Sequence, residues 1–232
     1  MTKLATENLA REEICRVGKS LFDRGYVHAT AGNISVRLED GFLITPTDAC
    51  LGFLDPARLA RLDALGQHLS GDLPSKTITL HTRIYRATEK FDPNVRCVIH
   101  THSTYCVQLT LQLGSTVVEN SVYSELLPPI TPYFVMKVGH VPVIPYDRPG
   151  SPQTADMVEH AIDHFASRGV NLRAVMLERL GPNVWHHSAA QAMATLEELE
   201  ETAKLHWQKN NSITPLNTAQ LGQLMQAFHA KW

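Results

Sequence analysis

Apolar positions recur at two different spacings along this chain, and each spacing predicts a different kind of element. The spacing typical of one helix face predicts helices over residues 6–24, 74–87, 103–112, 152–167 and 188–209. Short apolar runs predict strands over residues 34–38, 42–45, 95–100, 133–138, 141–145, 174–177 and 184–186, with a further hairpin near 62–70. Strands and helices therefore alternate along the chain, which indicates the α/β class.

No internal repeat, low-complexity tract or linker interrupts this pattern. We therefore expect a single domain over residues 1–232, in which residues 210–232 form a C-terminal tail helix. The last long helix carries an acidic run at residues 197–201, and these carboxylates are predicted to form its solvated face.

The tetrapeptide 100–103, His-Thr-His-Ser, is the most informative stretch of the sequence. It closes a short apolar run typical of a buried strand, and side chains at i and i+2 of a strand point to the same side. His100 and His102 would then project together, with about 7 Å between their Cα atoms. Two imidazoles at this reach can share one divalent metal ion. The alternative is that they end the strand and form local hydrogen bonds.

Composition and charge exclude several classes of function. Hydrophobic residues make up 44% of the 232 positions and charged residues 19%, which is ordinary for a globular protein. A formal net charge of -2 provides no basic surface for nucleic acid. No run of 18 apolar residues predicts a membrane span, and the polar N-terminus lacks the core of a signal peptide. The four cysteines lack CxxC spacing, so we expect free thiols and a cytoplasmic location.

Five short sequence motifs, in this order and spacing, resemble the class II aldolase/adducin family over residues 8–210. They are residues 31–37, 44–47, 71–76, 81–86 and 100–103. Three further stretches, at 130–139, 145–151 and 196–204, look most like the branch of 3-oxo-tetronate 4-phosphate decarboxylases. L-fuculose-1-phosphate aldolase is similar to a lesser degree.

The resemblance implies a three-layer α/β/α sandwich around a mostly antiparallel sheet. It also implies a homo-oligomer, expected to be a tetramer, with active sites between neighbouring subunits. A divalent metal ion, zinc first and manganese or cobalt as alternatives, polarises a substrate carbonyl in such enzymes and stabilises an enediolate. The expected substrate is a small sugar acid or sugar phosphate.

A candidate phosphate site consists of Gly32, Asn33, Thr47, Ser75 and Lys76. Glycine allows close approach of the backbone, and an asparagine amide can donate a hydrogen bond. The serine precedes a helix N-terminus, where free N–H groups favour an anion. From these residues alone, a turn followed by a helix N-cap is the better explanation of the pattern, whereas the resemblance implies that they hold a substrate phosphate.

Three residues are candidates for catalysis: Thr77, His81 and Tyr133. His81 lies one helical turn after Thr77, so both face the same way. It is expected either to orient a metal-bound group or to be a satisfied core histidine. The resemblance implies that Tyr133 is a proton donor, and a packed strand tyrosine is the alternative.

The chain departs from the family pattern at three positions. Thr77 stands where the pattern has a catalytic glutamate, and a hydroxyl cannot exchange protons near neutral pH as a carboxylate can. Leu180 stands where the pattern has the third metal histidine, although a zinc site typically uses three protein ligands plus water. Asp48 follows Thr47 where the pattern has glycine. Glu178, two residues before Leu180, is the first candidate replacement donor, and His186, His187 or a neighbouring subunit are the alternatives.

These observations favour a metal-dependent carbon–carbon lyase of the decarboxylase or aldolase type. Loss of the glutamate favours decarboxylation, because CO₂ leaves without deprotonation of a hydroxyl. The alternative is a non-catalytic family member that acts as a binding or scaffold protein, and an isomerase or epimerase is a third hypothesis.

Overall fold

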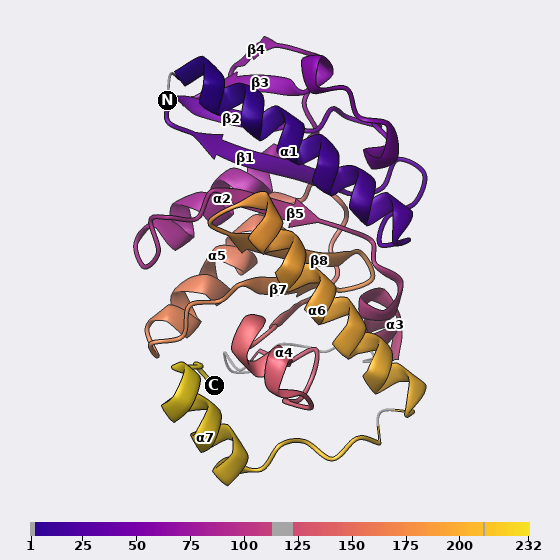
Figure 1. Cartoon of the computed structure of the whole chain (residues 1–232), viewed down its shortest axis with the longest axis vertical. Coiled ribbons are helices and arrows are strands. Elements are labelled where there is room, and N and C mark those ends of the chain that lie inside the picture. Colours follow the sequence, from indigo (N-terminus) through magenta and orange to yellow (C-terminus); the bar gives the residue numbers. More distant parts are fainter. Residues whose placement is uncertain (1–2, 113–122, 211) are drawn as a thin grey trace.

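The computed structural model describes residues 3–112, 123–210 and 212–232 and contains an eight-stranded sheet with helices on both faces (Figure 1). The strands are β1 (Asn33–Leu38), β2 (Gly41–Ile44), β3 (Ala60–Asp63), β4 (His68–Ser70), β5 (Cys97–His100), β6 (Val143–Ile144), β7 (Ala174–Leu177) and β8 (Gly181–His186). Their order across the sheet is β4-β3-β2-β1-β5-β8-β7-β6. Neighbouring strands are antiparallel except β6 and β7, which are parallel.

The helices of the described residues are α1 (Lys3–Asp23), α2 (Ile78–Glu89), α3 (Thr104–Gln112), α4 (Pro132–Lys137), α5 (Pro152–Ala166), α6 (Ala189–Gln208) and α7 (Thr218–Phe228), with two short 3-10 helices, η1 (Leu51–Phe53) and η2 (Pro56–Arg58). No helix among them is long and apolar enough to cross a membrane. The four cysteines are free thiols, as expected.

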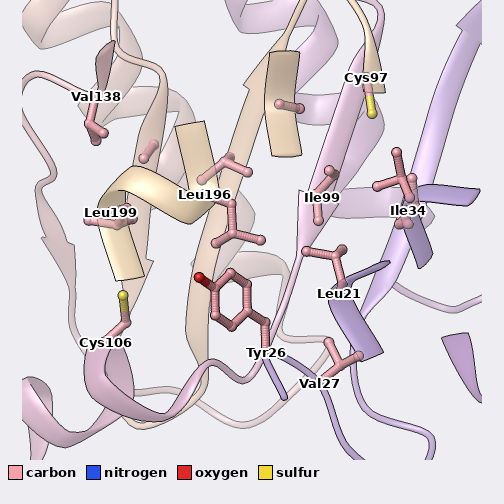
Figure 2. Close-up of a cluster of buried hydrophobic side chains, with 14 of the residues drawn as sticks. Leu21, Tyr26, Val27, Ile34, Cys97, Ile99, Cys106, Val138, Leu196 and Leu199 are labelled. Atoms are coloured by element: carbon pink, nitrogen blue, oxygen red, sulfur yellow. The ribbon is translucent and has the colours of Figure 1, made fainter. Parts of the chain in front are cut away.

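Two apolar cores lie on opposite faces of the sheet. The larger core packs α1, α3 and α6 on one face and includes Ile99 (Figure 2). The other packs α2 and α5 on the opposite face and includes Val98 and Trp185. Val98 and Ile99 belong to different cores because successive strand side chains point to opposite faces. The predicted sandwich with a mostly antiparallel central sheet is therefore confirmed.

The prediction of a strand over residues 133–138 is wrong, because this segment forms helix α4. The Thr131 hydroxyl accepts a hydrogen bond from the Phe134 backbone N–H at 3.1 Å, and Pro132 occupies the first helical turn. An N-cap followed by proline is a helix-start signal. The apolar run behind it satisfies a strand pattern and a short helix equally, so the cap determines the outcome.

The acidic run at residues 197–201 is only partly solvated. Glu200 is buried, and its two carboxylate oxygens accept hydrogen bonds from the backbone N–H groups of Tyr105 at 2.8 Å and Cys106 at 3.0 Å. These are among the first N–H groups of α3, which have no partner inside the helix. The prediction that all of these acids face solvent is wrong for Glu200, which anchors the helix that follows residues 100–103.

The C-terminal segment ends in α7, which lies at the edge of the molecule beside α4 (Figure 1). Its N-terminus carries a capping box, in which Asn217 and Gln220 each bond the other's backbone N–H. None of the residues of α7 is buried. The predicted tail helix thus begins later than residue 210 and occupies only residues 218–228.

We expect Gly181→Ala to lower the free energy of unfolding by about 2–4 kcal/mol. Gly181 has a φ of +136°, and a Cβ atom there would overlap the carbonyl oxygen of Thr101 and lie 3.2 Å from the Cα atom of His102. Urea denaturation measures the loss. Gly150→Ala is the matched control, because Gly150 has a φ of +80° and an added Cβ would meet nothing within 4 Å. Gly150→Ala should lower the free energy of unfolding by about 1–2 kcal/mol, which is the strain of an alanine in a left-handed backbone conformation. Equal losses would contradict a close approach at Gly181.

Candidate functional site

Strand register places three polar side chains in one row across the middle of the sheet. Asn33 on β1 pairs with His100 on β5, and His100 pairs with Asn183 on β8. Directly paired residues point to the same face, so the three side chains lie together on the face that α2 covers. All three are buried. The row thus joins the motif at residues 31–37, part of the predicted phosphate site, to the predicted metal-binding motif at residues 100–103.

His81 of α2 is tied to this face by a hydrogen-bonded chain. Its Nδ1 lies 2.7 Å from the Ser35 hydroxyl, which lies 2.9 Å from the Tyr85 hydroxyl. The Tyr85 hydroxyl also lies 3.0 Å from the Ser35 carbonyl and 3.3 Å from the Arg96 carbonyl, and both carbonyls can only accept. When the Tyr85 proton goes to one of these carbonyls, the Tyr85 oxygen accepts the proton of the Ser35 hydroxyl. The Ser35 oxygen in turn accepts from Nδ1–H of His81. In this arrangement the Nε2 atom of His81 carries a lone pair.

His100 has the same tautomer for a simpler reason. Its Nδ1 lies 3.0 Å from the carbonyl oxygen of Pro182, which can only accept, so Nε2 again carries the lone pair. Burial, and then the neighbouring His102, lower the pKa of His100 to about 3. Burial, and then His100, lower the pKa of His81 to about 3. Both imidazoles are therefore neutral at physiological pH, the form that binds metal ions.

The predicted histidine pair does come together. The ring centroids of His100 and His102 are 5.0 Å apart, and His102 is half-buried just beyond the end of β5. The ring of His28 lies 6.4 Å from that of His102. Sequence reasoning missed His28, although it lies three residues before the motif at residues 31–37. The site thus has one more histidine beside the predicted pair than the sequence indicated.

The turn between β7 and β8 lies directly against the histidine pair. The tight packing of Gly181 on the backbone of Thr101 and His102 places it there. Leu180, the residue before, packs its side chain against the apolar core under α2 and α5. The Glu178 carboxylate accepts a hydrogen bond from the Tyr146 backbone N–H at 2.9 Å. The turn therefore brings position 180 close to the histidine pair, but the leucine at this position has no atom that could bind a metal ion.

The residues present fit a divalent ion only in part. His100 and His102 offer two imidazoles at a suitable separation, which supports binding of an ion. Within residues 3–112, 123–210 and 212–232, however, no three His, Cys, Asp or Glu side chains gather closely enough to hold one. The structure does not bring Glu178 into such a group, so its role as third donor stays a prediction.

The predicted phosphate site is assembled from three neighbouring segments. The Thr45 N–H donates to the Ile34 carbonyl at 3.0 Å, and the Ser75 N–H donates to the Thr45 carbonyl at 3.2 Å. Thr47 and Lys76 are exposed beside them. The motifs at residues 31–37, 44–47 and 71–76 thus form one surface, on which Asp48 is also exposed.

Gly32 connects this surface to the histidine pair. It has a φ of +84°, and a Cβ atom there would lie 2.9 Å from the carbonyl oxygen of His100 and 2.7 Å from a Val27 methyl group. Glycine is needed because the loop passes so close to the end of β5. The phosphate-site residues and the imidazoles therefore belong to one site.

Several buried polar atoms around His100 have no partner among the described residues. They are Oδ1 of Asn33, Nε2 of His81, and both amide atoms of Asn183. A buried polar atom without a partner costs about 1–3 kcal/mol, so such atoms are rare away from functional sites. The sequence did not single out Asn183, because only the register of β8 places it beside His100.

Tyr133 lies elsewhere in the chain's own fold. It is 61% exposed on the first turn of α4 and lines a groove of about 650 Å³ between α4, α6 and the C-terminal segment. None of the other predicted site residues lines this groove. Within one chain, the structure does not bring Tyr133 to the histidine pair.

We expect Glu200→Ala to lower the free energy of unfolding by about 2–3 kcal/mol, because it leaves the buried N–H of Cys106 and the partly buried N–H of Tyr105, both at the start of α3, without an acceptor. Thermal unfolding and the binding of a phosphorylated ligand measure the effect on the fold and on the adjoining site. Glu201→Ala is the matched control, since this side chain is mostly exposed. If both variants unfold at the same temperature, the anchoring role of Glu200 is wrong.

Comparison with known proteins agrees with this geometry. The profile described as Class II Aldolase and Adducin N-terminal domain matches residues 12–207. The 3-oxo-tetronate 4-phosphate decarboxylase of Cupriavidus necator is 48% identical over 99% of this chain and 100% of its own length.

Solved structures agree as well. The crystal structure of YgbL from Escherichia coli superposes with a TM-score of 0.78 and 37% identity, over 94% of this chain and 99% of that one. L-fuculose-1-phosphate aldolase from Thermus thermophilus superposes with a TM-score of 0.70 and 25% identity, over 89% of this chain and 98% of that one.

Proposed function

Because the chain belongs to the class II aldolase and adducin family, we propose that it is a carbon–carbon lyase that decarboxylates a phosphorylated 3-oxo sugar acid. The observation that carries this proposal is the contact of Gly32 with the backbone of His100, which joins an anion-binding surface to a pair of imidazoles. The full-length relative that is 48% identical is a 3-oxo-tetronate 4-phosphate decarboxylase, which supports the same reaction class.

The reaction breaks one bond, between the carboxylate carbon and the carbon next to the ketone. The electron pair of that bond moves toward the ketone oxygen and forms an enediolate, while the carboxylate leaves as CO₂. A proton then returns to the carbon, which completes a ketone one carbon shorter. No hydroxyl is deprotonated, so this chemistry does not need the carboxylate that Thr77 replaces, whereas aldol cleavage does.

The family is metal-dependent, and His100 and His102 are the residues proposed to hold a divalent ion here. Zinc is the first candidate because imidazole suits it, with manganese and cobalt as alternatives. When bound, such an ion supplies positive charge beside the ketone oxygen. The hydrogen bond from His100 to Pro182 fixes the ring so that Nε2 faces away from the backbone.

The other proposed roles follow from position. Asn33, Thr47, Ser75 and Lys76 bind the phosphate, to which lysine contributes charge. Thr77, whose hydroxyl lies 2.8 Å from that of Ser75, and the neutral His81 position the reacting end of the substrate.

Tyr133 is exposed and separate from the other site residues, so we propose that it donates a proton in a neighbouring subunit's site. A homotetramer in the cytoplasm, in which each chain forms one domain with a tail helix, is the proposed setting.

The second candidate is a family member that binds the phosphorylated acid without turnover. It is favoured by Thr77 and Leu180, which replace two groups of the family pattern. Both candidates predict binding, and only the lyase predicts CO₂.

The deciding experiment incubates the protein with 3-oxo-tetronate 4-phosphate and zinc or manganese and follows CO₂ release. The lyase predicts a rate above the spontaneous decarboxylation of the acid, in proportion to the protein added. Saturable binding with no rate above the spontaneous one would replace the lyase by the binding protein.

A further inference from the structure

An arginine lies in the turn between β7 and β8, next to the histidine pair. Gly181, at the end of this turn, packs against the backbone of Thr101 and His102, and Arg179 precedes it by two residues. Two residues of chain span at most about 7 Å. The long side chain of Arg179 can therefore reach the space in front of the pair.

The backbone of Arg179 is held in an unfavourable conformation. Its φ is +63°, in the left-handed region, and its N–H donates to the Thr110 hydroxyl of α3 at 3.0 Å. Such strain persists only where the surroundings fix it, and it clusters at functional sites. Ala29 and Asp48, which also have positive φ values without being glycine, border the same site. The strain therefore supports a functional role for this turn.

The guanidinium of Arg179 is available for a ligand. Its Nε atom lies 3.6 Å from Oε1 of Glu178, which is too long for a hydrogen bond, and half of its side chain is exposed. The other Glu178 oxygen accepts a hydrogen bond from the Tyr146 backbone N–H at 2.9 Å. Within residues 3–112, 123–210 and 212–232 this guanidinium forms no hydrogen bond, so its planar fork of N–H donors can bind a carboxylate through two parallel bonds.

The order of the strands separates this cation from the phosphate surface. β1 begins at Asn33, β5 ends at His100 and β8 begins at Gly181, and antiparallel pairing brings these three ends to one edge of the sheet. The phosphate-site residues, with Lys76 among them, lie beside β1 and β2, whereas Arg179 lies beside β8. From β1 to β8 is two strand spacings, about 10 Å. An acid with a phosphate at one end and a carboxylate at the other can therefore lie across this row, with the imidazoles between its ends.

We propose that Arg179 binds the carboxylate of the substrate, the group that leaves as CO₂, and thereby selects sugar-acid phosphates over sugar phosphates that lack a carboxylate. This inference rests on the proposed function. Two parallel hydrogen bonds from the guanidinium fix the plane of the carboxylate as well as its position. Arg179 is thus a specificity-determining residue at the end of the substrate opposite the phosphate.

The proposed role has a distinct kinetic signature. The carboxylate loses its charge as CO₂ forms, so Arg179 stabilises the bound acid more than the transition state. An interaction of this kind lowers KM without raising kcat. Arg179→Met should therefore raise KM for decarboxylation at least about tenfold and leave kcat unchanged or higher. A residue that served only to hold the turn would not produce this division between KM and kcat.

The direct test is a calorimetric titration of the whole protein with two stable probes. One is 4-phosphoerythronate, which carries a carboxylate and a phosphate but lacks the ketone needed for decarboxylation. The other is erythritol 4-phosphate, which has an alcohol in place of the carboxylate. Wild-type protein should bind the acid at least about tenfold more tightly than the alcohol. Arg179→Met should lose this preference by weakening the binding of the acid alone. Arg179→Lys should retain part of it, since lysine keeps the charge but not the planar fork.

Arg16→Met is the matched control. Arg16 lies on α1, its Nη2 atom is 3.7 Å from the Glu13 carboxylate, and 69% of its side chain is exposed. It thus forms the same kind of loose pair with a neighbouring carboxylate as Arg179 does. The control should bind both probes as wild type does, and thermal unfolding confirms that all three variants fold.

Equal weakening of both probes by Arg179→Met, or of neither, would overturn the proposal. A lower kcat with an unchanged KM would overturn it as well. The binding result is independent of CO₂ release. A preference that depends on Arg179 in a protein that releases no CO₂ would remove the lyase and retain this site. Release of CO₂ with a preference that Arg179→Met leaves unchanged would remove this role of Arg179 and retain the lyase.

Discussion

Replacing His100 by asparagine is expected to lower kcat/KM for decarboxylation about 1,000-fold, which corresponds to about 4 kcal/mol of lost transition-state stabilisation. An asparagine amide can still donate to the Pro182 carbonyl, as Nδ1–H of His100 does now. The substitution therefore removes Nε2, the nitrogen proposed to hold the ion, while it retains the bond that holds this end of β5 to β8.

The measurement is the rate of CO₂ release at several substrate concentrations, together with metal content after dialysis against each ion. His206→Asn is the matched control, because His206 is a buried histidine of α6 that is not part of the site. We expect the control to retain wild-type kinetics. A rate for His100→Asn within tenfold of wild type would show that this histidine does not hold the ion or the substrate.

Thr77→Glu is expected to raise the rate of aldol cleavage of a sugar phosphate about 100-fold, because a positioned general base typically contributes 10²–10⁴-fold. Position 77 is the N-cap of α2, where the helix dipole favours an ionised carboxylate. The Thr77 side chain makes no capping hydrogen bond of its own. Decarboxylation should change much less, since it requires no such base.

Cleavage of fuculose 1-phosphate, followed by the release of its aldehyde product, measures this gain. Thr77→Gln provides the control, because glutamine has the size of glutamate but cannot exchange a proton. The gain should be larger when Thr77→Glu is combined with Leu180→His, because the double variant restores the family residue at two of the three positions where the chain departs from the pattern. Equal rates for the glutamate and glutamine variants would mean that position 77 does not face the reacting bond.

Most of the fold could be predicted because its signals are local. Apolar periodicity identified β1, β5, β7, α2, α5 and α6 close to their observed bounds. The failure at α4 also has a local cause: the N-cap Thr131 and Pro132 outweigh an apolar run that also fits a strand. Glu200 was misplaced for a different reason. Its partner is the N-terminus of α3, more than ninety residues earlier in the chain.

The candidate site shows the same division between local and non-local information. The spacing of His100 and His102 was sufficient to predict that the pair comes together, and the pair does so. Asn183 and His28 were missed because their places beside the pair depend on strand register and on the packing of a distant loop. The donor role of Glu178 stays a prediction. Its carboxylate accepts a hydrogen bond from the Tyr146 backbone N–H, a contact that no periodicity reveals.

The chain of hydrogen bonds from Tyr85 through Ser35 to His81 gives this protein a built-in spectroscopic reporter. The Nδ1 proton of His81 is fully buried and hydrogen-bonded, so its exchange with water should be slow enough for it to appear as a separate low-field resonance in a proton NMR spectrum. Because this ring lies next to His100, an ion or substrate arriving there would shift the resonance. Occupancy of the site can therefore be followed without turnover and without a label.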